Sequence, residues 1–268
     1  MKIRVIADLH GAYALLKRKL RPALPLMILG DCFNLVDFRT LEGAAAKVMG
    51  KGDIARILIT LAVRGKKPAA ALADRLVLKN PEKMNKLREI AAEEYALLAK
   101  MLPADAWVTF GNVDFPDLLA EAVGDKFHDQ RTVDIDGIVF GFVGGTPSYE
   151  QSLRLAGELG DEVFSGRIHG LPACDVLATH FPADIHDLIF DTVSGKTWGG
   201  SPVISEWCVK NKPKLHLCGH VHNPLKRNAV IGETLHWNVG GFRYNGLTAI
   251  LDTAKIKEGL VDEAIVVE

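Results

Sequence analysis

The sequence lacks the features that mark membrane, secreted and nucleic-acid-coating proteins. Its four cysteines show no CxxC spacing. The longest apolar stretch, around residues 57–63, is far too short to span a bilayer, and the first ten residues lack the parts of a signal peptide. A net charge of −1 argues against a protein that coats nucleic acid with its whole surface. We therefore expect a cytoplasmic protein with reduced thiols and no membrane partner.

The composition is typical of a globular enzyme. With 268 residues, of which 48% are hydrophobic and 24% charged, the chain is long enough to bury a sizeable core. We expect residues 1–268 to form a single domain. Short β-rich runs alternate with helix-like stretches near the N-terminus, and β-rich segments dominate after residue 131. Helices are predicted around 149–164 and 202–210, the latter starting at Ser201-Pro202.

Metal-binding side chains occur in five short blocks in one order along the chain. The blocks are Asp8-Leu9-His10, Gly30-Asp31-Cys32-Phe33-Asn34, Gly111-Asn112-Val113-Asp114, Thr179-His180 and Gly219-His220-Val221-His222. Each block follows a predicted strand, at the carboxyl end, where open α/β sheets place their ligands. Any one block would occur by chance in many chains, but all five in this context predict one site for divalent ions.

A different kind of segment lies between the second and third blocks. Residues 42–102 are rich in Ala, Leu, Lys and Glu, with apolar residues at helical spacing. We predict about three helices, broken at Pro68 and at Asn80-Pro81. Residues 47–100 contain 12 Lys and Arg against 6 Asp and Glu, so this helical insertion is basic. One interpretation is a helical surface that is either solvated or forms a dimer, and in the second case the protein would be a homo-oligomer. The other interpretation is a cap that attracts polyanionic substrates.

Taken together, the five blocks resemble the calcineurin-like metallophosphoesterase family, whose pattern is DxH, GDxx(D/N), GN, H and GHxH. The resemblance covers most of the chain outside the insertion. It implies an α/β fold, a two-sheet β-sandwich flanked by helices, here with an all-helical insertion. It also implies a phosphate-ester substrate, which includes nucleotides and nucleic acid.

The resemblance further implies a ligand set for two divalent transition-metal ions. One ion would take Asp8, His10, Asp31 and His222, and the second would take Asp31, Asn112, His180 and His220, so that Asp31 bridges them. Manganese is the metal we expect, with iron, zinc and nickel as alternatives. Asp31, Asn112 and His180 are the expected catalytic residues. The ions would activate a water to hydroxide that attacks phosphorus.

One position departs from the family pattern. Many members carry a histidine after the asparagine of the third block, and here that residue is Val113. A valine can neither donate a proton nor hydrogen-bond to phosphate, and the loss of a general acid typically costs ~10²–10⁴-fold in rate. His186 is a candidate replacement, and Arg243 is either a phosphate ligand or a surface ion-pair partner.

Three function classes follow from these residues. The first is a metal-dependent phosphoesterase, for which hydrolysis of phosphodiesters is the favoured activity. The second is a nuclease with the same centre, although no run of alternating aromatic and basic residues supports single-strand stacking. The third is a non-catalytic metal-binding module on the same fold. The complete ligand set favours catalysis.

Overall fold

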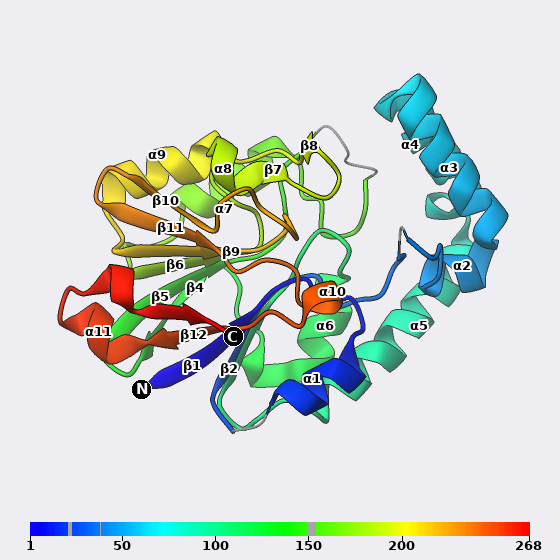
Figure 1. The fold of residues 1–268 in the computed structure, drawn as a ribbon. Helices are drawn as coiled ribbons and strands as arrows, with labels where there is room; N and C mark the ends of the chain where they lie inside the picture. Colours follow the sequence, from blue (N-terminus) through cyan, green and yellow to red (C-terminus); the bar gives the residue numbers. More distant parts are fainter. Residues whose placement is uncertain (21–22, 38, 150–153) are drawn as a thin grey trace.

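The computed structural model describes residues 1–20, 23–37, 39–149 and 154–268, and it shows two stacked β-sheets with helices outside both (Figure 1). The first sheet has the order β13 (Ile265–Val267), β12 (Ala249–Asp252), β1 (Lys2–Ile6), β2 (Leu26–Leu29) and β3 (Ala106–Thr109). The second has the order β10 (Asn228–Ile231), β11 (Thr234–Asn238), β9 (Leu215–Cys218), β6 (Val176–Thr179), β5 (Ile138–Val143) and β4 (Arg131–Ile135). The predicted α/β fold with two stacked sheets is confirmed.

Parallel strands form the centre of each sheet. Strands β1, β2 and β3 run parallel in the first sheet, and β5, β6, β9 and β11 run parallel in the second. Antiparallel strands complete both sheets. The carboxyl ends of parallel neighbours meet at one edge of a sheet, so the loops that follow them are brought together.

Alternating side chains divide the core into three layers. Ile3, Val5 and Phe140 point between the two sheets, where a buried apolar cluster joins them. Ile6 and its neighbours on the opposite face pack against helices on the outside of the first sheet. Leu177 and its neighbours do the same on the outside of the second sheet. The central strands, such as β2, β6 and β9, are therefore buried on both faces, which explains their almost continuous apolar sequences.

Eleven α-helices and a two-stranded ribbon complete the described part of the chain. The helices are α1 (Tyr13–Lys19), α2 (Ala44–Met49), α3 (Lys51–Arg64), α4 (Lys66–Ala73), α5 (Pro81–Ala99), α6 (Pro116–Val123), α7 (Asp161–His169), α8 (His186–Ile189), α9 (Pro202–Asn211), α10 (Phe242–Asn245) and α11 (Thr253–Lys257). A π-helix, η1 (Asp74–Leu78), follows α4, and short 3₁₀ turns lie at Gly124–Lys126 and Val261–Glu263. The ribbon pairs β7 (Phe190–Asp191) with β8 (Lys196–Thr197). None of the described helices has the length and apolar character needed to cross a membrane.

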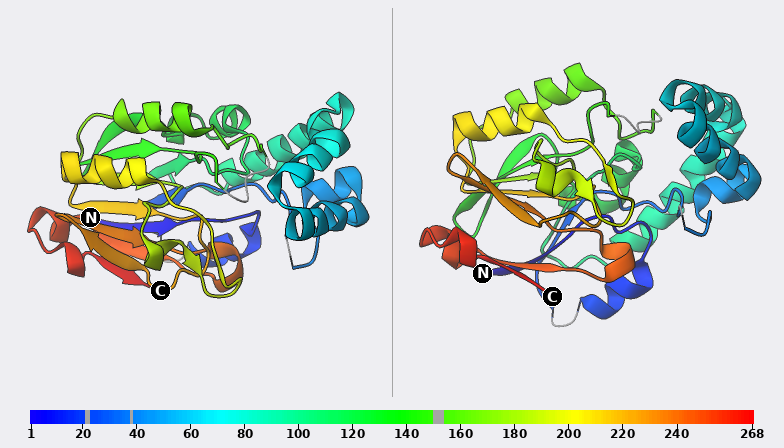
Figure 2. Two further views of the ribbon diagram at one scale, coloured as in Figure 1. Left: turned by 90° about the horizontal axis from the view of Figure 1, so that it is seen from above. Right: turned by 45° about the horizontal axis from the view of Figure 1, so that its top comes forward.

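Helices α2 to α4 lie to one side of the sheets in all views (Figures 1 and 2). The boundaries between the helices of the insertion, α2 to α5, agree only in part with the prediction. Asn80 caps α5 by accepting a hydrogen bond from the Lys83 backbone, as Asn80-Pro81 suggested. The predicted break at Pro68 is wrong, because this proline lies in the first turn of α4, where its missing N–H costs nothing. Gly65, with φ at 82°, separates α3 from α4 instead.

The helix predicted over 149–164 is wrong at residues 154–160. Residues 150–153 lie outside the described residues, residues 154–160 are not helical, and α7 begins only at Asp161. Gly157 explains the difference, because its N–H donates to the Asn112 carbonyl and a Cβ there would collide with the Gly111 carbonyl oxygen. This close approach holds the segment against a loop of the site. The predicted helix at 202–210 is confirmed as α9, with the Ser201 hydroxyl as its cap.

Candidate metal centre

The seven predicted ligands lie in loops that directly follow five strands. Asp8 and His10 follow β1, Asp31 follows β2, Asn112 follows β3, His180 follows β6, and His220 and His222 follow β9. Hydrogen bonds link these loops, including one from the His220 backbone N–H to Asp8 Oδ2 across the two sheets at 3.0 Å. The structure therefore brings all seven side chains to one edge of the sandwich.

Two glycines allow the second and third loops to touch. Gly30 has φ at 90°, and a Cβ on it would lie 2.5 Å from the Gly111 backbone nitrogen. A Cβ on Gly111 would collide with the Asp31 carboxylate. Only glycine fits at either position, which gives the Gly-Asp and Gly-Asn pairs of the sequence a steric cause.

A first cluster of donor atoms contains His10, His222, Asp8 and Asp31. The Nε2 atoms of His10 and His222 face each other at 3.3 Å. Asp8 Oδ1 lies 3.4 Å from His222 Nε2, and Asp31 Oδ2 lies 3.5 Å from His10 Nε2. Asp8 Oδ1 is buried and has no hydrogen-bond partner among the described residues. Ring nitrogens and carboxylate oxygens that converge on one point in this way are suited to a cation.

A second cluster contains Asn112, His180, His220 and the other oxygen of Asp31. Asn112 Oδ1 lies 3.2 Å from His180 Nε2 and 3.1 Å from His220 Nδ1. Asp31 Oδ1 lies 3.6 Å from His180 Nε2. His180 Nδ1 lies 2.8 Å from the Leu29 carbonyl, a contact that orients Nε2 toward the site. The residues of both clusters fit a pair of metal ions.

The backbone at the site is held in an unusual conformation. Asp8, His10, Asp31 and His220 have φ values of 55°, 42°, 50° and 68°, in the left-handed region that favours glycine. Each such residue costs about 1–3 kcal/mol, and the surrounding structure must supply that energy. Strain of this kind concentrates at functional sites, and here four of the seven predicted ligands carry it.

Burial keeps most of the imidazoles neutral. Desolvation, together with His222, lowers the pKa of His10 to about 3. Desolvation also lowers the pKa values of His180 and His220. Burial acts against the charged form of His222 too, but the adjacent Asp8 carboxylate raises its pKa above the ordinary value. Neutral imidazoles offer free lone pairs, which metal binding requires.

The carboxylate of Asp31 is electrostatically unfavourable without a cation. Burial and the nearby carboxylates of Asp8 and Asp114 raise its pKa well above the usual range. Two buried acids at one site repel each other unless positive charge lies between them. The arrangement is therefore chemically suited to hold divalent ions.

Asp114, the last residue of the third block and not one of the seven predicted ligands, joins the second and third loops. It is fully buried, and its carboxylate accepts hydrogen bonds from the backbone N–H groups of Cys32, Phe33 and Gly111 at 3.1, 2.9 and 2.8 Å. It also accepts one from the Tyr95 hydroxyl at 3.0 Å. Since Tyr95 belongs to α5, the insertion is built into the support of the site.

Tyr149 also lies at the site, although the sequence suggested only a helix start. Its ring meets the ring of His220 edge-on, with centroids 5.0 Å apart, and packs against Phe181 at 5.6 Å. Its carbonyl accepts a hydrogen bond from Lys66 Nζ of α4 at 3.0 Å. The basic insertion therefore contacts a residue that packs directly on a candidate ligand.

Two further candidates from the sequence, Arg243 and His186, differ in their relation to the site. Arg243 is paired with Asp37 at 3.0 Å and donates to the carbonyl of His10 and, at 2.6 Å, to Asn34 Oδ1, so it supports the first cluster. His186 is 69% exposed and lies 3.7 Å from Asp187. Within the described residues, no contact joins His186 to the seven ligands.

Comparison with known proteins gives one family match. The model of the family described as calcineurin-like phosphoesterase matches residues 1–224. No curated protein matches the sequence. A solved structure of a novel archaeal phosphodiesterase aligns over the whole of both chains with 14% identity and a TM-score of 0.41.

Two further solved structures show similar values. The NAD nucleotidase of Haemophilus influenzae has 11% identity and a TM-score of 0.44, over 94% of this chain and 46% of that one. Vps29 of Entamoeba histolytica, in complex with Zn²⁺, has 12% identity and a TM-score of 0.38, over 100% of this chain and 97% of that one. At these TM-scores the likenesses carry no argument about activity.

Proposed function

Because the chain belongs to the calcineurin-like phosphoesterase family, we propose that it is a phosphodiesterase that depends on a dinuclear metal centre. The observation that carries the proposal is the placement of Asp31, which turns one carboxylate oxygen to the His10 cluster and the other to the His180 cluster. A carboxylate shared by both clusters would hold two ions close together, and such a pair would supply electrostatic stabilisation to the phosphate oxygens of a substrate.

In this proposal, Asp8, His10, Asp31 and His222 would hold one ion, and Asp31, Asn112, His180 and His220 would hold the other. The Asp8 carboxylate also lies near both clusters. Its oxygens are close to the ligand atoms of His10 and His222 on one side and to those of Asp31 and His180 on the other. Asp31 is the proposed bridge because its two oxygens lie near rings of different clusters, His10 and His180, whereas the ring nitrogen paired with Asp8 is that of His222 in the first cluster.

The site residues have different chemical roles in this proposal. When bound, divalent ions would polarise the phosphoryl oxygens and lower the pKa of a water from ~15.7 to roughly 7. Asn112 contributes a neutral carbonyl oxygen, so the site accepts phosphate without the repulsion that a third carboxylate would add. His222, with a side chain 27% exposed, lies where the site meets solvent, whereas His180 is fully buried. Manganese is the proposed metal, with iron, zinc and nickel as alternatives.

Metal removal tests the centre directly. The chain loaded with Mn²⁺ and freed of excess metal should approach two ions by elemental analysis and should hydrolyse bis(4-nitrophenyl) phosphate. Dialysis against a chelator should abolish turnover, and added Mn²⁺ should restore it. A folded protein that binds two ions but hydrolyses neither diesters nor monoesters would instead be a non-catalytic module. A metal content near zero would exclude the centre itself.

Val113 predicts how the rate depends on the leaving group. Its backbone N–H donates to Asp31 Oδ1 at 3.1 Å, but its side chain has no proton to give. Without a general acid worth ~10²–10⁴-fold, nitrophenyl diesters should turn over far faster than alkyl diesters. The measurement is kcat/KM across aryl and alkyl diesters of graded leaving-group pKa. A flat dependence, with the chemical step shown to limit the rate, would mean that another acid acts.

A further inference from the structure

A cavity of about 320 Å³ lies between helices α3 and α4 of the insertion, and every charged residue in its lining is an arginine. Its lining residues are Arg56, Thr60 and Arg64 of α3, Pro68, Ala71 and Leu72 of α4, and Arg75 of η1. Three of the seven are arginines, and none of these described residues is acidic. The three α3 residues recur at a spacing of four, which places them on one face of that helix.

The arginines of this cavity are largely uncompensated. Arg56 Nη1 lies 4.0 Å from Asp53 Oδ1, at the limit of an ion pair, and its side chain is 60% exposed. Asp74, the acid next to Arg75 in the chain, is paired with Lys79 at 3.0 Å and with Arg154 at 3.4 Å. Among the described residues, the side chains of Arg64 and Arg75 have no hydrogen-bond or ion-pair partner. Guanidinium groups in this state are available for bidentate contacts with phosphate oxygens.

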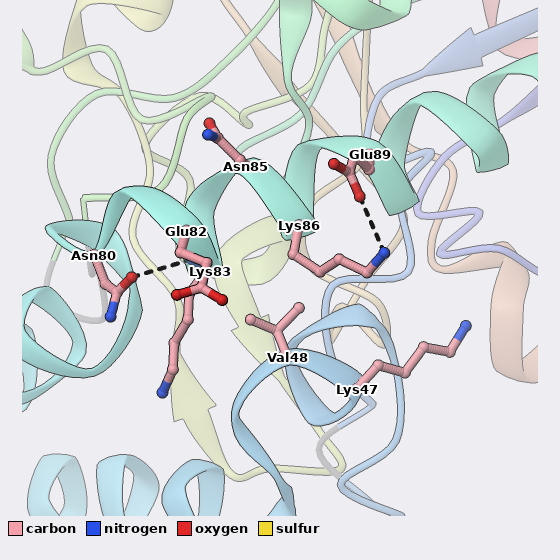
Figure 3. Close-up of a pocket in the computed structure, with 8 residues that line it drawn as sticks. All are labelled: Lys47, Val48, Asn80, Glu82, Lys83, Asn85, Lys86 and Glu89. Carbon is pink, nitrogen blue, oxygen red and sulfur yellow. Dashed lines mark hydrogen bonds and ion pairs between the residues drawn. The ribbon is translucent and has the colours of Figure 1, made fainter.

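A second cavity in the same insertion provides the contrast. It measures about 500 Å³ and lies between α2 and α5, where Figure 3 shows lysines and glutamates together. Lys86 Nζ is 3.0 Å from Glu89 Oε2, and the Asn80 side chain is used to cap α5. Glu82 also lines it, so its charges are of both signs. The Arg56–Arg64–Arg75 cavity differs because its charge has one sign.

Contacts connect the arginine cavity with the metal centre. Pro68, in its lining, lies in the same first turn of α4 as Lys66, whose Nζ donates to the Tyr149 carbonyl at 3.0 Å. The Tyr149 ring packs against His220. At the other end of α4, Asp74 of η1 pairs with Arg154 at 3.4 Å. One hydrogen bond and one ion pair thus connect the helices that form the cavity to Tyr149 and to Arg154.

We propose that the cavity lined by Arg56, Arg64 and Arg75 is a second anion site, which holds a phosphoryl group of a substrate that carries more than one. The inference rests on the proposed phosphodiesterase function, and it names the substrate class as diesters with further phosphates, such as short oligonucleotides. A small diester with one phosphate would use the metal centre alone.

The test compares two double variants of the full chain. R64Q/R75Q removes two charges from the arginine cavity. K83Q/K86Q removes two charges from the lysine–glutamate cavity of the same insertion and serves as the matched control. All four side chains lie outside the metal centre. Inorganic pyrophosphate is titrated calorimetrically into chelator-dialysed protein, so that metal ions cannot contribute to binding. The loaded enzyme is then assayed with a short oligonucleotide and with bis(4-nitrophenyl) phosphate.

We expect R64Q/R75Q to weaken pyrophosphate binding about tenfold at low salt, and less as salt screens the charges. It should raise KM for the oligonucleotide, leave kcat unchanged and leave the small diester unaffected, whereas K83Q/K86Q should match the unsubstituted chain. Equal weakening by both variants, no weakening by either, or an unchanged oligonucleotide KM would overturn the proposal. If the loaded chain shows no phosphoesterase activity but the pyrophosphate titrations still differ, the proposed function fails while the anion site stands.

Discussion

Asp31→Asn should remove most of the activity while leaving the fold intact. Its two oxygens face the two clusters, at 3.5 Å from His10 Nε2 and 3.6 Å from His180 Nε2, so the substitution weakens the binding of both proposed ions. Metal ions contribute several kcal/mol to transition-state stabilisation, and each 1.4 kcal/mol is about tenfold in rate. We therefore expect kcat/KM to fall by about 10³-fold, with fewer than two ions per chain by elemental analysis.

The metal-free fold should tolerate this substitution. Burial and the carboxylates of Asp8 and Asp114 raise the pKa of Asp31, which means that its negative charge is unfavourable in the absence of a cation. A neutral amide of the same shape removes that repulsion, and its oxygen can still accept from the Val113 N–H. Urea denaturation of the chelated protein should thus show no loss of stability. Asp187→Asn, at a carboxylate paired with exposed Lys226, is the matched control and should change neither property.

The outcome that contradicts the bridge is clear. If Asp31→Asn retains two ions and near-normal kcat/KM, the shared ligand is another residue. Asp8 is then the first to test, because it also neighbours both clusters. If Asp31→Asn unfolds the metal-free chain, the loss of activity says nothing about metal binding.

The convergence of the seven predicted ligands could be expected from the sequence because the signals are local. Each block follows a short apolar run that ends in a polar residue, and parallel strands bring their carboxyl ends to one edge. Gly30 and Gly111 belong to the same local signal, since the contact between their loops tolerates no Cβ. The order of the blocks then resembled one family, and residues 1–224 match it.

The support of the site could not be predicted because it depends on contacts between distant parts of the chain. The Asp114 carboxylate lies 81 and 82 residues from the two N–H groups of Phe33 and Cys32 that it accepts from. Tyr149 meets His220 across a similar separation. No periodic pattern in the sequence encodes such pairs. The absence of the predicted helix at residues 154–160 has the same origin, because the composition is helical but Gly157 is held against the Asn112 loop.

Asp114→Ala should cause the largest loss of stability among single changes near the site. The carboxylate accepts three backbone N–H groups and the Tyr95 hydroxyl, and the site around it is buried. Alanine would leave all four donors without a partner, and each unsatisfied buried group costs about 1–3 kcal/mol. Burial raises the pKa of Asp114, so removing its charge offsets part of this cost. We expect the free energy of unfolding to fall by about 3 kcal/mol or more, measured by urea denaturation of the metal-free chain.

Two companion variants separate the hydrogen bonds of Asp114 from its charge. Asp114→Asn keeps one oxygen acceptor but turns an amide N–H₂ toward backbone donors, so its loss should lie between those of alanine and the native residue. Tyr95→Phe removes one donor to Asp114 and the acceptor for the Phe115 N–H, at 2.9 Å, and should cost about 1–3 kcal/mol. Since Asp114 positions the loops of Asp31 and Asn112 without facing either cluster, a folded Asp114→Asn should bind metal more weakly but keep its leaving-group dependence. If Asp114→Ala is as stable as the native chain, the carboxylate does not hold these two loops together.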